Sequence, residues 1–510
     1  MSSNKKTMIN MICSVMVLAT NVVISFFLSP YIVKHIGVEA NGFVTLANNF
    51  VTYAQLIVAA LNSMAARFIT LSYVKKDYTK ANLYFNSVFW GNLIIVAVLI
   101  LPATYFIVCM ENLVDVPNNI LWDVKLLFSF VFFNFFITTG FPNWDCGTYI
   151  TNRLDRRYIP QVCTALFRCI FIFLTLTIFA PHVWYVGIAA SFVTLIELVV
   201  NGYNTHHLTP ELRIVLPPQK IICSKQSIIE LVGSGIWNSV SSVGNMLLSG
   251  LDLIICNLFI DSTAMGVISL SKILPHYMQT FSSSICSAFA PELMINYASG
   301  KNDQVLKSLK RACKITSIIL ILPLAGIMVL SVDFFKLWVP TQDAQLLSQL
   351  SSITCMGYAF TSGTQILYNV FSTVNKVRVN SILLMVSGLV STIIVFILLK
   401  YTGLGLYAVA GVSTIVCLIR NMLYTVPYAA KYLGYKKTEF YPMVLMCFIS
   451  TLIVTGIGYI IRHYLIEVHN WIDFLLCGMS IVFVGGVINF YIFLSKTERN
   501  YLIAKIKKRF

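Results

Sequence analysis

The chain has 510 residues, of which 57% are hydrophobic and 11% charged, and its mean hydropathy is +0.79. Because soluble globular proteins carry a charged fraction nearer ~25%, this composition excludes a soluble enzyme, and its apolar content excludes a disordered chain. The 36 Lys and Arg residues outnumber the 20 Asp and Glu residues, which gives a net charge of +16. The 13 cysteines show no CxxC spacing and lie mostly in apolar runs, which indicates buried thiols rather than disulfides or a zinc site.

Apolar segments of about bilayer length follow one another along the chain. They cover 8–33, 42–70, 83–110, 121–143, 159–180, 184–206, 226–256, 264–292, 313–332, 345–371, 380–400, 405–430, 442–461 and 471–494. The first segment is longer than a secretory h-region of ~7–15 residues and has no small-residue cleavage site, so we predict a retained helix. The sequence thus predicts an all-α integral membrane protein with about 14 transmembrane helices.

The basic residues predict how these helices are oriented. Of the 36 Lys and Arg residues, 27 lie at the two chain ends or in the loops on the same side, and five lie on the opposite side. Because cytoplasmic loops carry the excess of Lys and Arg, we expect both termini in the cytoplasm. The net charge then reflects topology and attraction to anionic lipid, and it needs no nucleic-acid partner.

The connecting segments carry little chemistry. They contain no Walker, HExxH or GxSxG motif, and the His206–His207 pair has no neighbouring cluster of Cys or carboxylate residues. We therefore predict no metal site and no cofactor, apart from a coupling cation (H+ or Na+) if transport is coupled. These features favour a transporter over an enzyme.

An internal repeat indicates two related halves. A shift of 224 residues aligns Asn21 with Asn245, Gly42 with Gly266, Tyr53 with Tyr277 and Gln55 with Gln279. Chance similarity between apolar segments is the alternative explanation. The repeat predicts two parallel six-helix lobes, over 1–206 and 226–430. A cytoplasmic linker over 207–225 joins them, and two helices and a basic tail follow over 431–510.

Polar side chains recur every three or four residues on the predicted helices 1, 2, 7 and 8. In lipid, such stripes face protein or a water-filled cavity, although Ser and Asn also form contacts between packed helices. Because the same two helices of each lobe carry the stripes, we predict a central cavity. The candidate substrate-binding residues are Arg67, Lys272, His276, Asp252, Asn21, Asn245, Gln55, Gln279 and Arg420.

The order of six, six and two helices resembles the multidrug/oligosaccharidyl-lipid/polysaccharide (MOP) exporter superfamily, as do the segments 37–42, 249–252 and 261–266. The sequence is most similar to the polysaccharide-transporter branch, the Wzx-type oligosaccharide flippases. This resemblance implies a cationic cavity lined by helices 1, 2, 7 and 8 and a groove for a lipid tail on helices 13 and 14. It also implies a bacterial inner-membrane protein that moves an undecaprenyl-diphosphate-linked oligosaccharide to the outer leaflet by alternating access, for cell-surface polysaccharide synthesis.

Within this hypothesis, Lys272 and Arg67 attract the diphosphate at different stages of transport. The alternatives are that Arg67 snorkels to the inner interface and that Lys272 snorkels outward or pairs with Asp252. Arg168 and Glu197 are predicted to lie at similar depths, roughly 13 Å from the inner face, and to form a structural ion pair.

The implied partners are the lipid-linked oligosaccharide, membrane lipids and glycan-assembly enzymes. A cation-coupled multidrug exporter, with Asp252 as its coupling carboxylate, is the alternative function. A membrane glycosyltransferase or polymerase is less favoured because the outer loops are short. Related lipid II flippases carry arginines in their first helices, whereas helix 1 here has no charge between Lys6 and Lys34, which argues against lipid II as the substrate.

Overall fold

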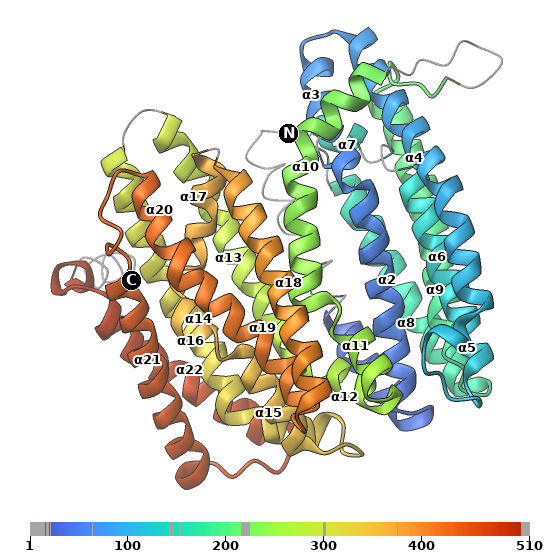
Figure 1. The fold of residues 1–510 in the computed structure, drawn as a ribbon. Helices are drawn as coiled ribbons and strands as arrows, with labels where there is room; N and C mark the ends of the chain where they lie inside the picture. The colour runs from blue at the N-terminus through green and yellow to red at the C-terminus, as the bar shows by residue number, and fades with distance from the viewer. Residues whose placement is uncertain are drawn as a thin grey trace. The chain divides into compact units, whose positions relative to one another are not determined.

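The computed structural model describes residues 16, 20, 22–63, 65–141, 144, 146–151, 153, 155–215, 225–298, 302–374 and 376–500. Across these residues the regular secondary structure is helical, which confirms the all-α prediction (Figure 1). The chain divides into two compact units. Unit 1 comprises Met1–Met246 and Leu253–Gly266, and unit 2 comprises Leu247–Asp252 and Val267–Phe510.

Unit 1 contains the helices of the first half of the chain. They are α2 (Val38–Asn62), α3 (Ala65–Val74), α4 (Tyr78–Val108), α5 (Met110–Leu113), α6 (Leu121–Gly140), α7 (Cys146–Ile150), α8 (Asp155–Ile178), α9 (Trp184–Leu208) and α10 (Lys225–Asn245), with most of α11 (Asp252–Phe259) and the first half of α12 (Ser262–Ser271). Helix α9 packs against both α6 and α8, and α10 packs against α2. A buried apolar cluster that includes Ile69, Tyr84 and Leu231 joins α3, α4 and α10.

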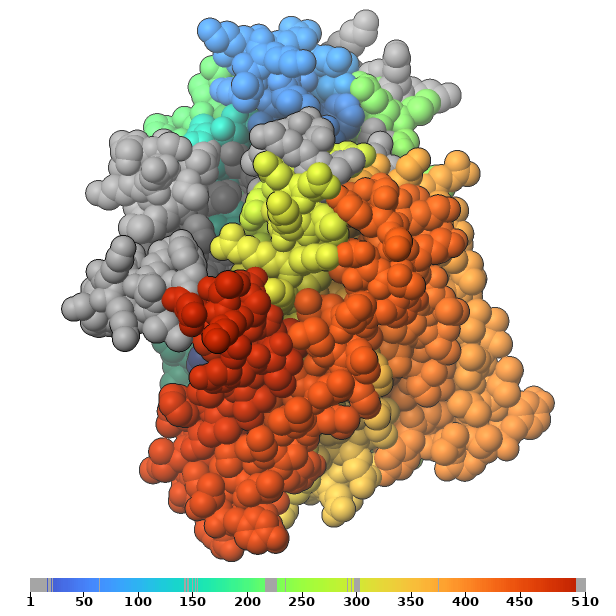
Figure 2. All heavy atoms as spheres, turned by 90° about the vertical axis from the view of Figure 1, so that its left-hand side faces the viewer, coloured from blue at the N-terminus to red at the C-terminus, as the bar shows by residue number. Residues whose placement is uncertain are grey.

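Unit 2 contains the remaining helices. They are η2 (Met246–Gly250, mostly within this unit), the second half of α12, α13 (Ile273–Ala298), α14 (Asn302–Trp338), α15 (Ala344–Cys355), α16 (Tyr358–Thr361), η3 (Gln365–Leu367), α17 (Tyr368–Thr373), α18 (Val377–Tyr401), α19 (Leu406–Arg420), η4 (Asn421–Thr425), α20 (Val426–Tyr432), α21 (Tyr441–Ile460), η5 (Ile461–Leu465) and α22 (Trp471–Phe493). Helix α14 packs against α13, α15, α21 and α22. The face of unit 2 in Figure 2 is formed largely by α18 to α22, coloured light orange to red.

Side-chain caps fix where several helices begin. The carboxylate of Asp77 accepts the backbone N–H of Lys80 at 3.0 Å at the start of α4. The Asn470 side chain accepts the N–H groups of Ile472 and Asp473 at 2.8 and 3.0 Å at the start of α22. These bonds satisfy amide groups that have no partner within the first turn of a helix.

The membrane-spanning character of the chain is confirmed. Among the described residues, 10 helices are long and apolar enough to cross a membrane, or up to 11 if a pair bent by 43° at Gly250 is one span. The predicted segment 8–33 is described in part, with an apolar helix over Val22–His35, and its residues 8–15, 17–19 and 21 lie outside the described residues. The predicted segments 264–292 and 345–371 are broken into shorter helices. The count of 14 and the lobes defined by the repeat therefore stay predictions.

Three of the described helical segments are π-helical turns: η2 follows α10, η4 lies between α19 and α20, and η5 ends the helix that begins with α21. A π-turn holds one residue more than an α-helical turn, and such turns occur often at functional sites. Each of the three lies next to a basic residue in or beside an apolar helix, as described below.

Gly42 and Gly266, which the shift of 224 residues aligns, lie in direct contact inside unit 1. A Cβ atom on Gly42 would lie 3.0 Å from the Cα of Gly266, and one on Gly266 would lie 2.7 Å from the backbone carbon of Val38. The absence of both side chains lets α2 and α12 approach closely, as small residues do in other membrane helices.

Gly266→Ala is therefore expected to lower the free energy of unfolding by about 1–3 kcal/mol, because the added methyl group meets backbone atoms that cannot rotate away. Thermal unfolding of the purified protein in detergent measures the change. Gly233→Ala on α10 is the matched control, since nothing lies within 4 Å of a Cβ at that position. Equal midpoints for the two variants would contradict the prediction.

Candidate functional site

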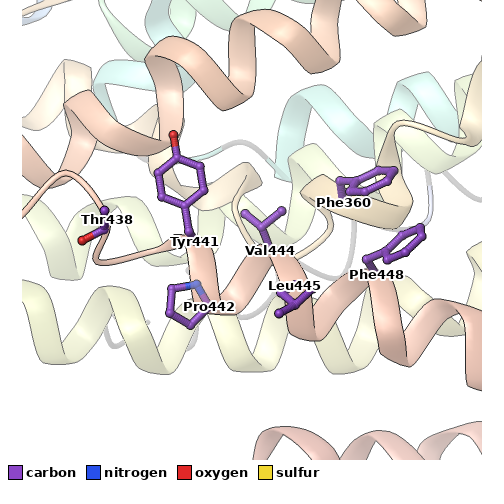
Figure 3. A pocket seen from close by; sticks show the side chains of 7 residues that line it. All are labelled: Phe360, Thr438, Tyr441, Pro442, Val444, Leu445 and Phe448. Carbon is purple, nitrogen blue, oxygen red and sulfur yellow. The ribbon is translucent and has the colours of Figure 1, made fainter.

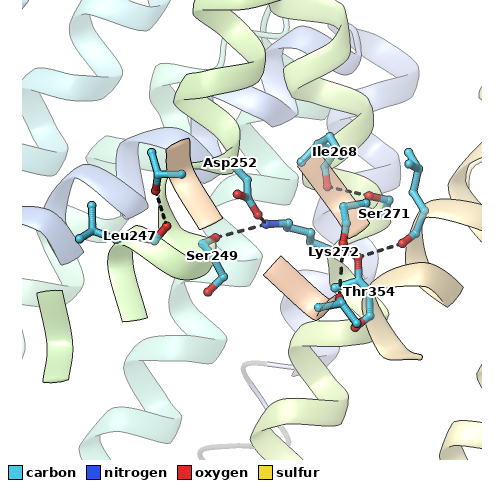
Figure 4. A network of polar contacts seen from close by, with 11 residues as sticks. Leu247, Ser249, Asp252, Ile268, Ser271, Lys272 and Thr354 are labelled. Atoms are coloured by element: carbon cyan, nitrogen blue, oxygen red, sulfur yellow. Dashed lines mark hydrogen bonds and ion pairs between the residues drawn. The ribbon is translucent and has the colours of Figure 1, made fainter. Parts of the chain in front are cut away.

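The first candidate site is an ion pair between Lys272 and Asp252 in unit 2. Lys272 lies at the junction of α12 and α13, and its ammonium group contacts the carboxylate of Asp252 at the start of α11. The same Nζ donates a hydrogen bond to the Ser249 carbonyl at 3.2 Å, in the π-turn η2 (Figure 4). The Asp252 side chain is only 7% exposed and that of Lys272 is 23% exposed. The structure thus agrees with the alternative in which Lys272 pairs with Asp252.

Hydrogen bonds to two backbone carbonyls of the π-turn help to attach this segment to unit 2. Thr392 of α18 donates its hydroxyl hydrogen to the Leu247 carbonyl at 2.8 Å. Residues Leu247–Asp252 belong to unit 2, whereas the chain before and after them belongs to unit 1. Three polar contacts, from Thr392 and from Lys272, therefore hold a short stretch of helix in unit 2.

The junction that carries Lys272 is itself fixed by hydrogen bonds. Ser351 of α15 donates to the Ser271 carbonyl at 2.5 Å, and the Ser271 hydroxyl donates to the Ile268 carbonyl at 3.0 Å. Because these serines are buried, their hydrogen bonds fix the backbone next to Lys272.

The other predicted cavity residues are dispersed over several helices. Arg67 is exposed on α3, Gln55 on α2, Asn245 at the end of α10, and His276 and Gln279 on α13. Asn21 lies outside the described residues. Of the nine candidates, the structure brings Asp252 and Lys272 into ionic contact, and the substrate-binding role of the whole set stays a prediction.

The predicted pair of Arg168 and Glu197 lies between the packed helices α8 and α9. The two side chains interact electrostatically. Glu197 also accepts a hydrogen bond from the Thr164 hydroxyl at 3.0 Å, while the Nε of Arg168 is buried and has no hydrogen-bond partner. The geometry places both charges at this helix contact, and their mutual neutralisation stays a prediction.

A second cation, Arg420, lies at the end of α19, where the π-turn η4 begins. Its Nη2 donates to the Tyr368 hydroxyl at 2.8 Å, and its guanidinium lies 5.7 Å from the centre of the Tyr368 ring. The Tyr368 hydroxyl donates to the side-chain oxygen of Asn421, which also accepts the Thr425 hydroxyl at 3.0 Å. Among the described residues, Arg420 is thus held by neutral groups alone.

A third cation, Arg462, lies in η5 and has a carboxylate partner. Its Nε and Nη2 contact the two carboxylate oxygens of Asp333 on α14 at 2.5 and 2.8 Å. Asp333 is only 4% exposed. This two-pronged geometry is the strong form of an arginine–carboxylate pair, and it fastens the end of α21 to α14.

The comparisons with known proteins agree with this architecture. Residues 8–294, more than half of the chain, match the family model described as polysaccharide biosynthesis protein. The chain belongs to this family. A relative described as the uncharacterized membrane protein EpsK of Bacillus subtilis (strain 168) is 25% identical over 509 residues, which cover 99% of this chain and 98% of the relative.

Solved structures of transporters share the fold of this polysaccharide biosynthesis family member. A lipid II flippase MurJ in an inward closed conformation gives a TM-score of 0.65 at 14% identity. The match covers 94% of this chain and 99% of the MurJ chain. An inward-facing multidrug resistance MATE family transporter of the MOP superfamily gives a TM-score of 0.61 at 15% identity. The match covers 81% of this chain and 94% of the MATE transporter. The predicted polysaccharide family is thereby confirmed, and the fold is shared with a transporter of the MOP superfamily. This family member is a multi-pass membrane protein with a transporter fold.

An apolar groove lies on the surface of unit 2. It has a volume of about 650 Å³ and is lined by Phe360, Thr438, Tyr441, Pro442, Val444, Leu445 and Phe448, from α16, α21 and the residues just before α21 (Figure 3). Lys437 precedes the groove in sequence, and its Nζ lies 5.5 Å from the centre of the Tyr428 ring. The groove therefore combines an apolar wall with a basic residue near one end.

The segment after α22 is tied back to unit 2 by charge. Lys314 of α14 contacts both carboxylate oxygens of Glu498 at 2.8 Å and holds the pKa of that carboxyl at about 2. Ser495 and Glu498 also exchange hydrogen bonds, because each side chain accepts the backbone N–H of the other. This capping box begins a short helix whose basic residues follow the last membrane span.

Sequence reasoning missed Tyr368 and the pairing of Arg462 with Asp333. A tyrosine inside an apolar segment usually packs in the core, so Tyr368 gave no separate signal. The Gly357 and Gly363 positions could have shown that 345–371 is a broken helix, because glycine weakens a helix and allows close packing.

Proposed function

We propose that this protein transports an undecaprenyl-diphosphate-linked oligosaccharide from the cytoplasmic to the outer leaflet of a bacterial inner membrane by alternating access. In this proposal both termini lie in the cytoplasm. The observation that carries the proposal is the partly buried lysine of a polysaccharide biosynthesis family member, Lys272, which contacts the buried carboxylate of Asp252.

The chemistry of such a substrate matches this site. A diphosphate brings negative charge into a region of low dielectric constant. There, an ammonium group stabilises the phosphate charge far better than neutral hydrogen-bonding groups do. The phosphate would replace Asp252 as the acceptor for Lys272. Arg67, which is exposed on α3, would attract the headgroup at another stage of the cycle.

The lipid part of the substrate needs an apolar path. The groove on α21 would hold a segment of the prenyl chain, since six of its seven lining residues are apolar or aromatic. The nearby Lys437 would then lie on the side of the groove where an anionic headgroup is favoured.

A cation-coupled drug exporter is the second candidate function, with Asp252 as the coupling carboxylate. The contact with Lys272 counts against it, because the ammonium group already neutralises this carboxylate and competes with a sodium ion or a proton. A coupling role for Asp252 would require Lys272 to leave it first.

Reconstitution of the full chain into proteoliposomes tests the proposal. A polyprenyl-diphosphate-linked oligosaccharide is incorporated with a label on the sugar, and exposure of the labelled headgroup to an added glycosidase is followed. We expect headgroup exposure to be faster than in protein-free vesicles. Export of a cationic dye driven by a pH or sodium gradient, without headgroup translocation, would instead establish the exporter.

A further inference from the structure

Three basic side chains of unit 2 lie at π-turns of its described helices, and they differ in their partners. Lys272 contacts Asp252 and a carbonyl of η2, and Arg462 of η5 contacts Asp333. Arg420, next to η4, has no carboxylate within ion-pair distance among the described residues.

Arg420 lies too deep to reach the membrane surface. The helices α19, η4 and α20 form one span from Leu406 to Tyr432, and Arg420 is near its middle. At ~1.5 Å per residue, the guanidinium is attached about 20 Å from either end of the span, which is farther than an arginine side chain can extend. A cation at this depth is expensive unless an anion neutralises it.

The neutral groups around Arg420 orient it without cancelling its charge. The Tyr368 hydroxyl takes one hydrogen bond from Nη2, and the sulfur of Cys417 lies 3.7 Å from the same nitrogen. The Nε of Arg420 is buried and has no hydrogen-bond partner. The residue as a whole is only half-buried, so the packed helices do not enclose it completely.

We infer that Arg420 and Tyr368 form a binding site for a phosphoryl group, separate from the Lys272 pair. The inference rests on the proposed function in taking the transported lipid diphosphate as the source of this group. An arriving phosphate meets no competing carboxylate at Arg420, whereas at Lys272 it must displace Asp252. The diphosphate therefore binds at Arg420 without displacing an internal anion.

Binding to the purified full chain in detergent tests this site. Isothermal titration uses three probes: a polyprenyl diphosphate, inorganic pyrophosphate and the uncharged polyprenol. Their affinities separate the contribution of the headgroup from that of the lipid tail. We expect Arg420→Gln to weaken polyprenyl diphosphate binding about tenfold or more, since a hydrogen bond to a charged group is lost. Arg420→Lys keeps the positive charge, so its affinity for polyprenyl diphosphate is expected to fall less than that of Arg420→Gln. Polyprenol binding is expected to be the same in all variants.

Lys400→Gln is the matched control. Lys400 also lies over a tyrosine ring, 5.5 Å from the centre of Tyr401, but at the exposed end of α18. It is expected to bind both phosphate probes like the wild type. Thermal unfolding of each variant in the absence of ligand shows whether the fold is retained.

Unchanged affinity of a folded Arg420→Gln protein would overturn the inference, and so would equal loss of polyprenol and polyprenyl diphosphate binding. Binding of pyrophosphate alone, lost in Arg420→Gln, would assign the site to a free anion and overturn the lipid source. Binding is measured independently of transport. If Arg420 binds the diphosphate in a protein that translocates no headgroup, the proposed function is refuted while the binding site at Arg420 is confirmed.

Discussion

Lys272→Ala is expected to destabilise the protein by about 3–5 kcal/mol and to abolish headgroup translocation, because removal of the ammonium group leaves the Asp252 carboxylate buried and unpaired. The double variant Lys272→Ala/Asp252→Asn removes both charges. We expect it to recover most of the lost stability, since replacement of a whole buried ion pair by neutral groups is often tolerated.

The double variant separates the two roles of Lys272. If Lys272 binds the substrate phosphate, the recovered protein still fails to translocate the headgroup in proteoliposomes. If the ion pair is purely structural, translocation returns together with the thermal unfolding midpoint, and the assignment of Lys272 to the substrate is wrong. Asp252→Asn alone keeps the cation and is expected to bind the lipid diphosphate more tightly, because its internal competitor is gone.

Arg462→Gln is expected to cost about 3–5 kcal/mol of unfolding free energy by leaving the buried Asp333 carboxylate without its partner. The loss should first loosen α21 and α22, whose contact with α14 this pair supports. Thermal unfolding gives the global effect, and hydrogen exchange followed by mass spectrometry locates it.

Lys310→Gln is the control for this variant. Lys310 forms an ion pair with Glu439, but its side chain is 47% exposed, so the loss is expected to stay below ~1 kcal/mol. A loss in Lys310→Gln as large as that in Arg462→Gln would show that burial does not determine the effect. Uniform exchange throughout unit 2 would contradict the proposed local loosening.

Much of the fold could be predicted because bilayer-length apolar segments are a local property of the sequence. The positions of α4, α6, α18 and α22, for example, follow the predicted segments within a few residues. The breaks within 264–292 and 345–371 could not be predicted in this way, since an apolar segment shows the same hydropathy whether its helix is continuous or interrupted.

The candidate site could be predicted from the sequence only in part. Arg420 and Lys272 stand out because charge is rare inside apolar segments. Whether Lys272 meets Asp252 or water depends on the turn between α11 and α12, which brings residues 20 positions apart into contact. The partner of Arg420 depends on how the broken helix around Tyr368 packs against α19 and η4, which no short-range pattern encodes.

The π-turns also determine where this chain can change in length. Elsewhere in a membrane helix, deletion of one residue rotates everything beyond it by about 100°, so polar and apolar faces exchange places. A π-turn already holds one surplus residue, and its deletion restores an ordinary α-helical turn with both flanking faces retained. Among the described helices, 421–425 lies directly between α19 and α20, and it is therefore the site where a single-codon deletion would leave the helix packing intact while it moves the adjacent cation Arg420.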